Sequence, residues 1–578
     1  MHYQPIFDIA ELCALKGVTE TVLCPGSRCA PLTLAFTRHP RINTRTFSDE
    51  RSAGFVALGI AQQKQLPVAM ICTSGSAAYN FAPAVSEAYF SETPLIIFTA
   101  DRPSEWIGQH DGQTIFQPDI FGKHVKKSFQ LPQDYDHADS KWAINRIVND
   151  AINLAQQEPK GPVHINTPFR EPLYPQKEEK TEYSGPVRTI DYHKGENYIS
   201  SAVADKIREG WTSASKILIV VGQQDYDAIL HSEIGRLSRT HKIPVVCDII
   251  SNMNEDESFI THSDLFLGQA SDQVKTTLQP TLLITMGKSL VSKNLKLFLR
   301  KYPAKAHWHI QYAGLASDPF KNLTDVFAAS PTSIIRLLNE ILPAETFESQ
   351  KQFNFQKLWE IEERRATRAI NEFFPQDKLN EIEVVKELLS DIPDNCNLHL
   401  ANSMSVRYAN FIGLSTGRQK KKNIKVYANR GTSGIDGSTS TAIGHALSAD
   451  VINILITGDV AFFYDRNAFW HNYALPNLRV LLLNNHGGVI FNMIDGPASQ
   501  PEAAEYFITN QRLTADKLCE EFNFEHLKLD SKRKLRNYIK SFFEQDGRTK
   551  VLEVETNVHV NREIFDNLKL KIKNSYES

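Results

Sequence analysis

The sequence predicts an α/β protein made of three doubly wound domains, each built on a parallel sheet. Short apolar runs rich in β-branched residues recur along the chain, end at Gly, Asn or Asp, and are each followed by a stretch of helical periodicity. With 578 residues, the chain is too long for a single core. Two of the runs end at Asp459 and Asn485, a spacing that fits one strand–helix–strand crossover.

The apolar runs fall into three groups along the chain. In order, they are 21–26, 68–73, 94–100 and 162–166; then 216–222, 243–248, 281–287 and 307–311; then 397–401, 425–428, 452–458, 479–484 and 550–555. From this grouping we expect domains at 1–185, 186–355 and 356–578. The charged, Pro-containing stretch 172–180 is predicted to link the first two domains. The charge pattern of residues 358–365 predicts a solvated helix that ends near Pro375.

The composition argues against several classes of protein. A hydrophobic content of 42% and a charged content of 23% are ordinary for a globular protein. The net charge of −3 gives no nucleic-acid footprint and no polybasic membrane patch. The apolar runs are far shorter than the roughly 20 residues needed to span a bilayer, and the N-terminal residues show no secretory signal. The seven cysteines are dispersed and form no CxxC pair, which predicts free buried thiols in a reducing cytoplasm.

In the first predicted domain, acidic side chains open a helix and a loop of small residues follows a strand. Ser48 is expected to cap the helix, with Asp49 and Glu50 in its first turn. These acidic residues either complement the helix dipole or carry catalysis. The loop at 73–75 opens a second helix, so its N–H groups are positioned to meet an anion or a polar ring. Many strand–helix loops have this composition, so the loop alone does not decide between a turn and a ligand site.

Oxygen ligands follow two buried strands of the third predicted domain. A parallel sheet would place the carboxylate of Asp459 and the amide oxygen of Asn485 side by side at its carboxyl edge, where open α/β folds bind ligands. Together with the backbone carbonyl of Gly487, they form a set that suits a hard cation such as Mg²⁺. Water and a phosphate-bearing cofactor would supply the remaining ligands.

Two further segments of the third domain, 402–407 and 429–437, follow strands and supply hydroxyl groups and free backbone donors. Either segment alone is equally well explained by ordinary turn chemistry. Together with Asp459 and Asn485, they indicate a ligand site at one edge of the sheet.

Basic residues also follow strands in all three domains. They are Arg28, Arg102, Lys293, Arg407 and Arg430. Because arginine binds carboxylates in a bidentate fashion, several cations at strand ends indicate a substrate with more than one carboxylate.

The pair Gly458-Asp459, followed by Asn484-Asn485, resembles the diphosphate–magnesium motif of the thiamine diphosphate-dependent enzymes. The third residue of the usual Gly-Asp-Gly is Val460 here, at a position that supplies no side-chain ligand. Members of this family have three α/β domains: a pyrimidine-binding, a central and a diphosphate-binding domain. The resemblance therefore implies that order of domains, with thiamine diphosphate and Mg²⁺ as cofactors, where Mn²⁺ can substitute for Mg²⁺.

A closer resemblance is to the carboligases of this family that act in menaquinone biosynthesis. It is carried by segments of both outer domains, namely 25–28, 48–53, 99–103, 429–437 and 484–491. The implied transferase reaction is thiamine diphosphate-dependent decarboxylation of 2-oxoglutarate, followed by 1,4-addition of the resulting succinyl carbanion equivalent to isochorismate. In the central domain the family has a Lys-Arg pair, whereas this chain has Lys293-Asn294, so the pattern departs there.

The resemblance also implies roles for individual residues. Glu50 would share a proton with N1′ of the aminopyrimidine, and Ile435 would hold the cofactor bent. Further cofactor contacts are implied for Thr73, Ser74, Gly75, Asn402, Ser403, Gly434, Gly458, Ile490 and Phe491, and metal ligation for Asp459, Asn485 and Gly487. Substrate contacts are implied for Ser27, Arg28, Arg102, Gln113, Lys293, Ser403, Arg407 and Arg430.

The family also implies an assembly. In its members the pyrimidine site of one subunit faces the diphosphate site of another, so we expect a homodimer or homotetramer in the cytoplasm.

Three alternative functions are open at this point. One is another thiamine diphosphate-dependent 2-oxo acid decarboxylase or carboligase, such as an acetohydroxyacid synthase-like enzyme, although the strand-end cations argue for dicarboxylate substrates. A second is a relative that keeps the cofactor site as a sensor or scaffold, although the intact set of Glu50, Asp459 and Asn485 argues against it. A third is a nucleotide-binding α/β enzyme, which lacks support because neither GxGxxG nor GxxxxGKS/T follows the relevant strands.

Overall fold

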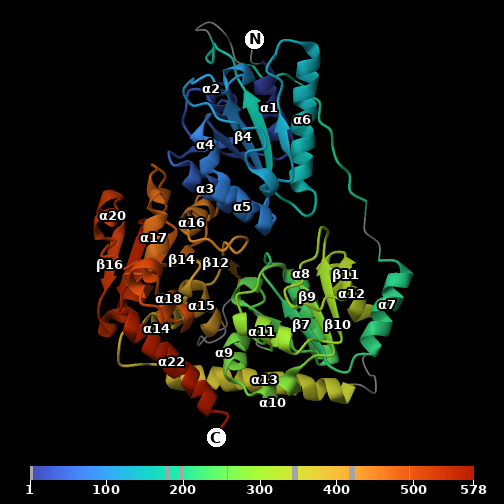
Figure 1. Cartoon of the computed structure of the whole chain (residues 1–578), viewed down its shortest axis with the longest axis vertical. Helices are drawn as coiled ribbons and strands as arrows, with labels where there is room; N and C mark the ends of the chain where they lie inside the picture. The colour runs from blue at the N-terminus through green and yellow to red at the C-terminus, as the bar shows by residue number, and fades with distance from the viewer. Residues whose placement is uncertain are drawn as a thin grey trace. The chain divides into compact units, whose positions relative to one another are not determined.

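The structure is a computed structural model that describes residues 4–175, 182–185, 187–195, 199–254, 256, 258–341, 349–414, 423–493 and 495–577. It contains three sheets with helices packed along their strands, which confirms the predicted α/β class (Figure 1). The strands of the three sheets lie at 20–168, 217–328 and 396–555, inside the three predicted segments. The exact domain boundaries stay a prediction, and residues 176–180 of the predicted linker lie outside the described residues.

The first sheet has six strands in the order β2-β1-β3-β4-β6-β5, and each neighbouring pair is parallel. The strands are β1 (Glu20–Leu23), β2 (Asn43–Thr46), β3 (Val68–Cys72), β4 (Leu95–Asp101), β5 (Ser128–Gln130) and β6 (Val163–Pro168). The helices of this segment are α1 (Gln4–Leu15), α2 (Ala30–Thr37), α3 (Glu50–Lys64), α4 (Ser76–Asn80), α5 (Ala82–Ser91) and α6 (Ala138–Gln156).

The second sheet has five strands in the order β11-β10-β9-β7-β8, again with parallel neighbours. The strands are β7 (Ile217–Val221), β8 (Val245–Cys247), β9 (Leu282–Met286), β10 (Ala306–Gln311) and β11 (Asp325–Ala328). The helices of this segment are α7 (Ser201–Thr212), α8 (Ala228–His241), α9 (Ser263–Gln269), α10 (Asp272–Leu278), α11 (Lys293–Lys301) and α12 (Pro331–Ile341).

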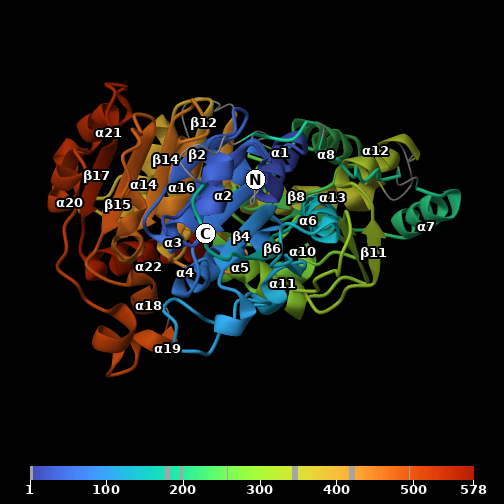
Figure 2. The same cartoon turned by 90° about the horizontal axis from the view of Figure 1, so that it is seen from above.

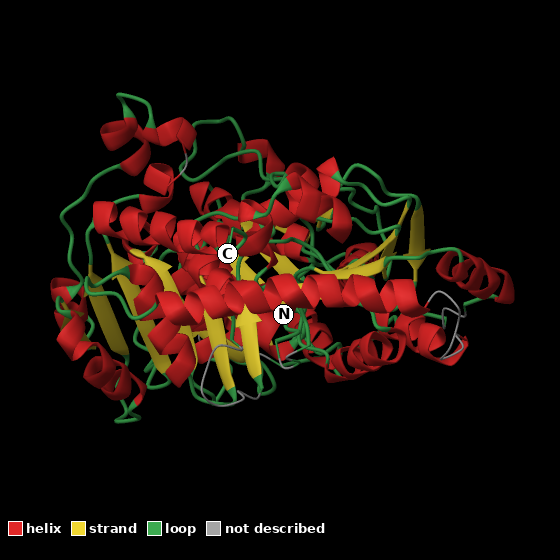
Figure 3. Cartoon of the chain, turned by 90° about the horizontal axis from the view of Figure 1, so that it is seen from below, coloured by secondary structure: helices red, strands yellow, loops and turns green. Residues whose placement is uncertain are grey.

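The third sheet has six strands in the order β13-β12-β14-β15-β17-β16, which lie side by side at the left of Figure 3. They are β12 (Cys396–Leu400), β13 (Ile424–Tyr427), β14 (Asn453–Gly458), β15 (Leu478–Asn484), β16 (Glu525–Leu529) and β17 (Lys550–Glu555). The longer helices are α13 (Ser349–Phe373), α14 (Glu381–Asp391), α15 (Met404–Ile412), α16 (Ser438–Ala446), α21 (Leu535–Phe543) and α22 (Val558–Asn574). The shorter ones are α17 (Asp459–Tyr464), α18 (Val489–Met493), α19 (Asp495–Ala498) and α20 (Asp516–Glu521), and α18 and α19 lie outside the row of strands in Figure 2.

The first and third sheets share one strand order and therefore one kind of ligand-binding edge. In each, the second strand along the chain lies on one side of the first, and the third strand lies on the other. The direction in which successive strands are added to the sheet thus reverses between β1 and β3 and between β12 and β14. Ligands bind outside the carboxyl ends of the strands at such a switch point. The topology predicts binding edges where β1 and β3 end and where β12 and β14 end.

The central strands β7 and β9 of the second sheet are buried on both faces, as the continuous apolar runs predict. In β7, Ile217, Ile219 and Val221 belong to one hydrophobic core, whereas Leu218 and Val220 belong to another. Successive side chains of a strand point to opposite faces, so both faces of this sheet are covered.

The contacts within the chain define two compact units. The first comprises Met1–Gly195, Asn429–Asn453 and Ala461–Leu478, and the second comprises the remaining residues. Inside the first unit, α16 packs closely against α3. A Cβ on Gly59 would lie 2.1 Å from the carbonyl oxygen of Thr441, and one on Gly444 would lie 2.2 Å from that of Val56. The small residues of α3 therefore serve a close helix contact.

Four strands fall outside the predicted runs: β2, β5, β11 and β16. Each lies at an edge of its sheet. Seven buried cysteines are unpaired, as predicted. Among the helices that the structure describes, none is long and apolar enough to cross a membrane.

The helix predicted around 358–365 is α13, which ends before Pro375 as expected. The expectation that it is solvated was wrong for one face. Trp359 is fully buried, and its ring centroid lies 5.9 Å from those of Phe266 and Phe298. The dense charges around Trp359 suggested exposure, yet an apolar stripe of the helix completes a core.

A buried ion pair joins α13 to the residues that precede α9. Nδ1 of His262 lies 2.6 Å from Oε1 of Glu363, and Nε2 lies 3.1 Å from the carbonyl oxygen of Ile412. Since both ring nitrogens face acceptors, the site favours the doubly protonated imidazolium. Burial lowers the pKa of His262, but the Glu363 carboxylate outweighs it and raises this pKa above the usual 6.5. Burial raises the pKa of Glu363, but His262 holds it below its usual 4.5.

We expect the stability of the protein to depend on pH through this pair. The raised pKa of His262 contributes stability that is full below about pH 6.5 and is lost as the pH rises through the folded-state value. The lowered pKa of Glu363 contributes stability that is full above about pH 4.5 and is lost as the pH falls. Replacing Glu363 by Gln should cost about 1–3 kcal/mol at pH 6 and less at pH 9.

Thermal and urea unfolding of the wild type and the Glu363→Gln variant at pH 6 and pH 9 measure this difference. Glu360→Gln changes a charge on the same helix outside the pair and is the matched control. An equal loss of stability at both pH values would contradict the assignment of the charged state.

Candidate active site

At the switch point of the first sheet, the loops after β1 and β3 lie against each other. A Cβ on Gly26 would lie 2.3 Å from Cβ of Thr73, so the approach requires glycine. Gly75 has φ +91°, and a Cβ there would lie 3.2 Å from Cα of Gln113. The structure thus gathers Ser27, which follows Gly26, with Thr73, Gly75 and Gln113 at one end of the sheet.

Buried amide side chains hold the loop after β3, and the loop contains two hydroxyl groups. The N–H of Gly75 donates to Oε1 of the buried Gln117 (2.9 Å), whose Nε2 donates to Oδ1 of Asn166 (2.9 Å). The hydroxyl oxygens of Thr73 and Ser74 are buried and have no hydrogen-bond partner among the described residues. Since unsatisfied buried polar atoms are rare, these hydroxyls are the groups that a ligand would satisfy.

Glu50 is the first residue of α3. The helix is capped by Asp49, whose carboxylate accepts from the N–H of Ser52 (3.1 Å). The expectation that Ser48 is the cap was wrong, because the carboxylate one residue later is the stronger acceptor for this N–H. The Glu50 side chain is half-buried, and its Oε2 accepts from Nδ2 of Asn80 (3.1 Å).

Asn80 connects the Glu50 carboxylate to the loop after β3, because it ends α4, the helix that this loop opens. Cys72 ends β3, and Cys24 directly follows β1. Burial raises the pKa of both thiols, and the charge of Glu50 adds to each rise.

The two predicted cations of the first segment are already engaged by protein groups. Nη1 of the buried Arg28 donates to the carbonyl oxygen of Phe169 (3.1 Å), and Nη2 lies 3.6 Å from Oε1 of Glu171. Arg102 pairs with Asp111 (2.9 Å). These contacts fix both guanidinium groups at strand ends, after β1 and after β4. Their contact with a substrate stays a prediction.

The loop 429–437 is fixed to helices of the first unit by Glu87. This buried side chain on α5 accepts from the N–H of Gly431 (2.8 Å), the N–H of Thr432 (2.7 Å) and the hydroxyl of Thr432 (2.8 Å). Burial raises the pKa of Glu87, and these donors oppose the rise, as does Arg430. The loop that carries Arg430 and the half-buried Ile435 is thus held by a carboxylate that the sequence did not single out.

Glycines let the same loop approach α3. A Cβ on Gly437 would lie 2.2 Å from the ring of Phe55, and Nη1 of Arg51 donates to the carbonyl oxygen of Asp436 (2.9 Å). A Cβ on Gly434 would lie 2.2 Å from Oδ1 of Asp436. The predicted cofactor residues Gly434 and Ile435 therefore sit in a loop whose path is set on both sides.

In the second unit, Asp459 lies at the switch point of the third sheet, directly after β14. Its side chain is buried, and Oδ2 accepts from Nε2 of Gln511 (2.6 Å). Burial raises the pKa of Asp459 to about 6, while Gln511 and the N–H groups of Val460 and Gly487 lower it. Gln511 links this carboxylate to the loop after β15, because its N–H donates to the carbonyl oxygen of His486 (3.0 Å).

Asn485 directly follows β15, and its side-chain oxygen has no hydrogen-bond partner among the described residues. Its Nδ2 donates to Oε1 of Glu381 (2.7 Å), whereas its Oδ1 is buried. Burial raises the pKa of Glu381 to about 7, Asn485 lowers it, and the Asp459 carboxylate raises it further. Glu381 therefore contacts Asn485 and is affected by the charge of Asp459.

Glu381 was not predicted from the sequence. It is the first residue of α14, after the N-cap Asn380. An acidic residue in a first helical turn is commonplace, so the sequence offers no signal that this side chain turns inward. Its position is set by packing between elements far apart along the chain.

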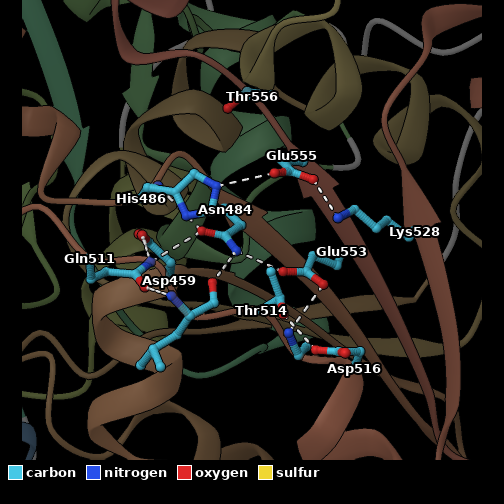
Figure 4. Close-up of polar contacts among 12 residues, drawn as sticks. Asp459, Asn484, His486, Gln511, Thr514, Asp516, Lys528, Glu553, Glu555 and Thr556 are labelled. Carbon is cyan, nitrogen blue, oxygen red and sulfur yellow. Dashed lines mark hydrogen bonds and ion pairs between the residues drawn. The ribbon is translucent and has the colours of Figure 1, made fainter.

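A polar network anchors the loop after β15 (Figure 4). Nδ2 of Asn484 donates to Oε1 of Glu553 (2.6 Å), and Oδ1 accepts from Nε2 of Gln511 (3.3 Å). His486 has φ +63°, and its Nε2 lies 3.3 Å from Oε1 of Glu555. In Figure 4 Gln511 points toward both Asn484 and Asp459, so it links the ends of β14 and β15.

The other predicted residues of the second unit lie near the same strand ends or on neighbouring helices. The buried Asn402 and the half-buried Ser403 (φ +72°) follow β12, and Nη1 of Arg407 donates to the carbonyl oxygen of Ser403 (2.6 Å). Gly458 precedes Asp459. On α18, Ile490 is followed by Phe491, whose ring centroid lies 6.1 Å from that of Phe507.

Lys293 and Asn294 begin α11 and differ in exposure. Lys293 is exposed, whereas Asn294 is half-buried and makes two hydrogen bonds to Asp264. The N–H of Asn294 donates to Oδ1 of Asp264 (2.6 Å), and its Nδ2 donates to the carbonyl oxygen of Asp264 (2.8 Å). A Cβ on Gly268 would lie 2.7 Å from Nδ2 of Asn294. Asn294 therefore links α11 to α9, where its side chain packs tightly against Gly268.

The predicted metal ligands fit a divalent cation. Asp459 supplies a buried carboxylate and Asn485 a buried amide oxygen without a partner, which is the donor set that Mg²⁺ prefers. The carbonyl oxygen of Gly487 accepts from the N–H of Val489 (3.0 Å) and keeps a second lone pair. Within the described parts of the chain, no three His, Cys, Asp or Glu side chains are grouped to hold a metal, so phosphate and water would have to complete this site.

The predicted site residues thus form two sets. One set lies in the first unit, at the ends of β1, β3 and β4 and in the loop 429–437, and it includes Glu50. The other lies in the second unit, at the ends of β12, β14 and β15 and on α18 and α11. Each set occupies the kind of edge where open α/β sheets bind ligands. Contact of either set with a cofactor or substrate stays a prediction.

Comparison with known proteins adds an independent finding. The family "Thiamine pyrophosphate enzyme, N-terminal TPP binding domain" matches residues 7–122, and "Middle domain of thiamine pyrophosphate" matches residues 192–400. The chain is 44% identical over 576 residues to the 2-succinyl-5-enolpyruvyl-6-hydroxy-3-cyclohexene-1-carboxylate synthase of Cytophaga hutchinsonii, with 100% of both chains covered. The proteins of the same name from Flavobacterium psychrophilum and Bacteroides thetaiotaomicron are 38% and 35% identical, with 96% of both chains covered in each case.

Proposed function

Because the chain belongs to the family of 2-succinyl-5-enolpyruvyl-6-hydroxy-3-cyclohexene-1-carboxylate synthases, which are thiamine diphosphate-dependent enzymes, we propose that it decarboxylates 2-oxoglutarate and adds the resulting succinyl unit to isochorismate. The addition is a 1,4-addition, and the products are CO₂ and the compound in the family name, an intermediate of menaquinone biosynthesis. The observation that carries this proposal is the buried pair of Asp459 and Asn485 at a switch point, in a chain that matches its relatives over their full length.

Two groups of residues would hold the cofactor, and in the family these groups come from different subunits. The hydroxyls of Thr73 and Ser74 and the N–H groups of their loop would meet the polar ring, whereas Asp459, Asn485 and Gly487 would hold Mg²⁺ or Mn²⁺ against the diphosphate. When bound, thiamine diphosphate supplies a nucleophilic carbon and an electron sink for decarboxylation.

The other side chains bind, orient and move protons. Glu50 holds or donates a proton at the ring nitrogen N1′, because a positioned carboxyl can do both as its protonation changes. Ile435, in a loop fixed by Glu87, supplies a rigid apolar support. Ile490 and Phe491 supply an apolar wall. The cations at strand ends, of which Arg28, Arg407 and Arg430 are three, bind the carboxylates of both substrates.

The family implies an oligomer. In its members, one subunit's pyrimidine site faces the diphosphate site of another, and the residues matched to these two sites include Glu50 and Asp459. We therefore propose a homodimer or homotetramer as the active form, located in the cytoplasm. Static light scattering of the protein, with and without thiamine diphosphate and Mg²⁺, measures the assembly.

The alternative is another thiamine diphosphate-dependent 2-oxo acid decarboxylase or carboligase. The number of cations at strand ends favours a donor with two carboxylates over pyruvate, which has one.

We expect CO₂ release and product formation with 2-oxoglutarate plus isochorismate, dependent on thiamine diphosphate and Mg²⁺. The measurement compares this rate with the rate for pyruvate plus isochorismate under the same conditions. Preference for pyruvate would refute the proposed donor and support the alternative.

A further inference from the structure

We propose that Glu381 is a positioning residue that orients the amide of Asn485, so that Oδ1 rather than Nδ2 faces the metal position. This inference rests on the proposed function, because it concerns the cation that Asp459 and Asn485 would hold. It adds to the site a residue that touches neither the cofactor nor the substrate.

The orientation of the amide follows from one hydrogen bond. A carboxamide has an oxygen acceptor at one end and an N–H donor at the other, and only the oxygen can ligate a cation. Nδ2 of Asn485 donates to Oε1 of Glu381 over 2.7 Å, which leaves Oδ1 buried and without a partner. The flipped amide would set Oδ1 against a carboxyl oxygen and direct an N–H at the cation. Glu381 thus selects the orientation that binds a metal.

Glu381 is itself held by two residues, Asn561 and Thr556. Its N–H donates to Oδ1 of Asn561 (3.0 Å), and its Oε1 accepts from the hydroxyl of Thr556 (3.1 Å). Nδ2 of Asn561 donates to the same hydroxyl oxygen (3.0 Å). Backbone and side chain of Glu381 are therefore both fixed to the start of α22, which makes the carboxyl a rigid reference for the Asn485 amide.

A neighbouring carboxylate, that of Glu383, stabilises the start of α14. The buried Glu383 accepts from Nδ2 of Asn380 (3.1 Å) and from the N–H of Gln376 (3.2 Å), and it lies 2.9 Å from Nζ of Lys532. Glu381 and Glu383 share the first turn of α14, yet only Glu381 contacts Asn485. Glu383 is therefore a matched control for burial, helix position and charge.

The test measures Mn²⁺ binding to the full chain in the presence of thiamine diphosphate, by the paramagnetic resonance signal of free Mn²⁺. Glu381→Leu keeps a buried side chain of similar size but removes the acceptor, and we expect it to raise the Kd for Mn²⁺ by about 10–100-fold. Glu381→Gln retains an oxygen that can accept from Nδ2, so its Kd should lie between those of the leucine variant and the wild type. Glu383→Gln should leave the Kd within about twofold of the wild type.

A double-mutant cycle separates positioning from a general structural effect. If Glu381 acts through Asn485, then Glu381→Leu should add nothing to the loss caused by Asn485→Ala, because neighbours that act as one unit are not additive. Circular dichroism and thermal unfolding confirm that each variant is folded. If the leucine variant does not fold, the glutamine variant with and without Asn485→Ala gives the same cycle.

The outcomes distinguish this inference from the function beneath it. Wild-type protein that binds no Mn²⁺ with thiamine diphosphate would overturn the proposed function, and this inference with it. Wild-type binding with an unchanged Kd in both Glu381 variants would overturn the inference alone. Equal losses for Glu381→Leu in the presence and absence of the Asn485 amide would also overturn it.

Discussion

Replacing Glu50 by Gln is expected to lower the turnover of 2-oxoglutarate and isochorismate by about 10²–10⁴-fold, the usual contribution of a positioned acid–base group. Glutamine has nearly the same shape and can still accept from Nδ2 of Asn80, so the start of α3 should remain folded. It cannot exchange a proton at the ring nitrogen. Steady-state kcat measures the loss, and titration of thiamine diphosphate by intrinsic fluorescence should show binding that is largely retained.

The control for this variant is Glu92→Gln, which removes a charge from the same unit at the end of α5. It should leave both kcat and cofactor binding close to the wild-type values. Undiminished turnover in the Glu50 variant would remove the acid–base role. A wild type that binds the cofactor but turns over no donor would favour the sensor or scaffold alternative.

The central strands could be predicted from the sequence, whereas four of the six edge strands could not. In β3 and β7 each residue is buried and the run is apolar from end to end, as in strands covered on both faces. The strands β2, β5, β11 and β16 lie at sheet edges, and their residues are largely half-buried or exposed. Their sequences need not be apolar, and only pairing with a neighbour makes them strands.

The candidate site divides in a similar way. The sequence identified Asp459 and Asn485 because the carboxyl ends of parallel strands converge, so residue type and spacing suffice. Glu87 and Glu381 lie on helices, where a carboxylate is ordinary. Their partners are distant in sequence: Gly431 lies 344 residues from Glu87, and Asn485 lies 104 residues from Glu381. Only tertiary packing turns such a side chain toward a loop. For the same reason, the pairing of Glu363 with His262 could not be predicted from a stretch of helix that is rich in charged residues.

These supports share a physical logic. Many of the predicted site residues lie in loops, where backbone alone fixes little, and buried carboxylates hold two of these loops, 429–437 and the loop after β15. Glu87 accepts three hydrogen bonds from the loop 429–437, and Glu553 and Glu381 hold the side chains of Asn484 and Asn485. Hydrogen bonds to charged groups are stronger than neutral ones, so each carboxylate orders a loop that packing alone would leave loose.

Replacing Asp459 by Asn is the second change with a large expected effect, a loss of Mn²⁺ affinity of about 100-fold or more in the presence of thiamine diphosphate. This exceeds the usual effect of an outer partner of a ligand, because the substitution removes the one charged protein ligand of the proposed set. The amide oxygen of Asn can accept from Nε2 of Gln511, as Oδ2 of Asp459 does, so the end of β14 should keep its contacts. The same titration of free Mn²⁺ measures the Kd, and kcat at saturating metal shows whether the loss is one of binding.

Asp516→Asn is the control, since Asp516 belongs to the same unit and accepts from the hydroxyl of Thr514 at the surface. Its metal affinity should match that of the wild type. The comparison is decisive because an isosteric amide changes charge and ligand type but little else: tight Mn²⁺ binding by the Asp459 variant would place the metal elsewhere. The unsatisfied Oδ1 of Asn485 would then need a different partner, and the switch point of the third sheet would lose its assignment as the diphosphate site.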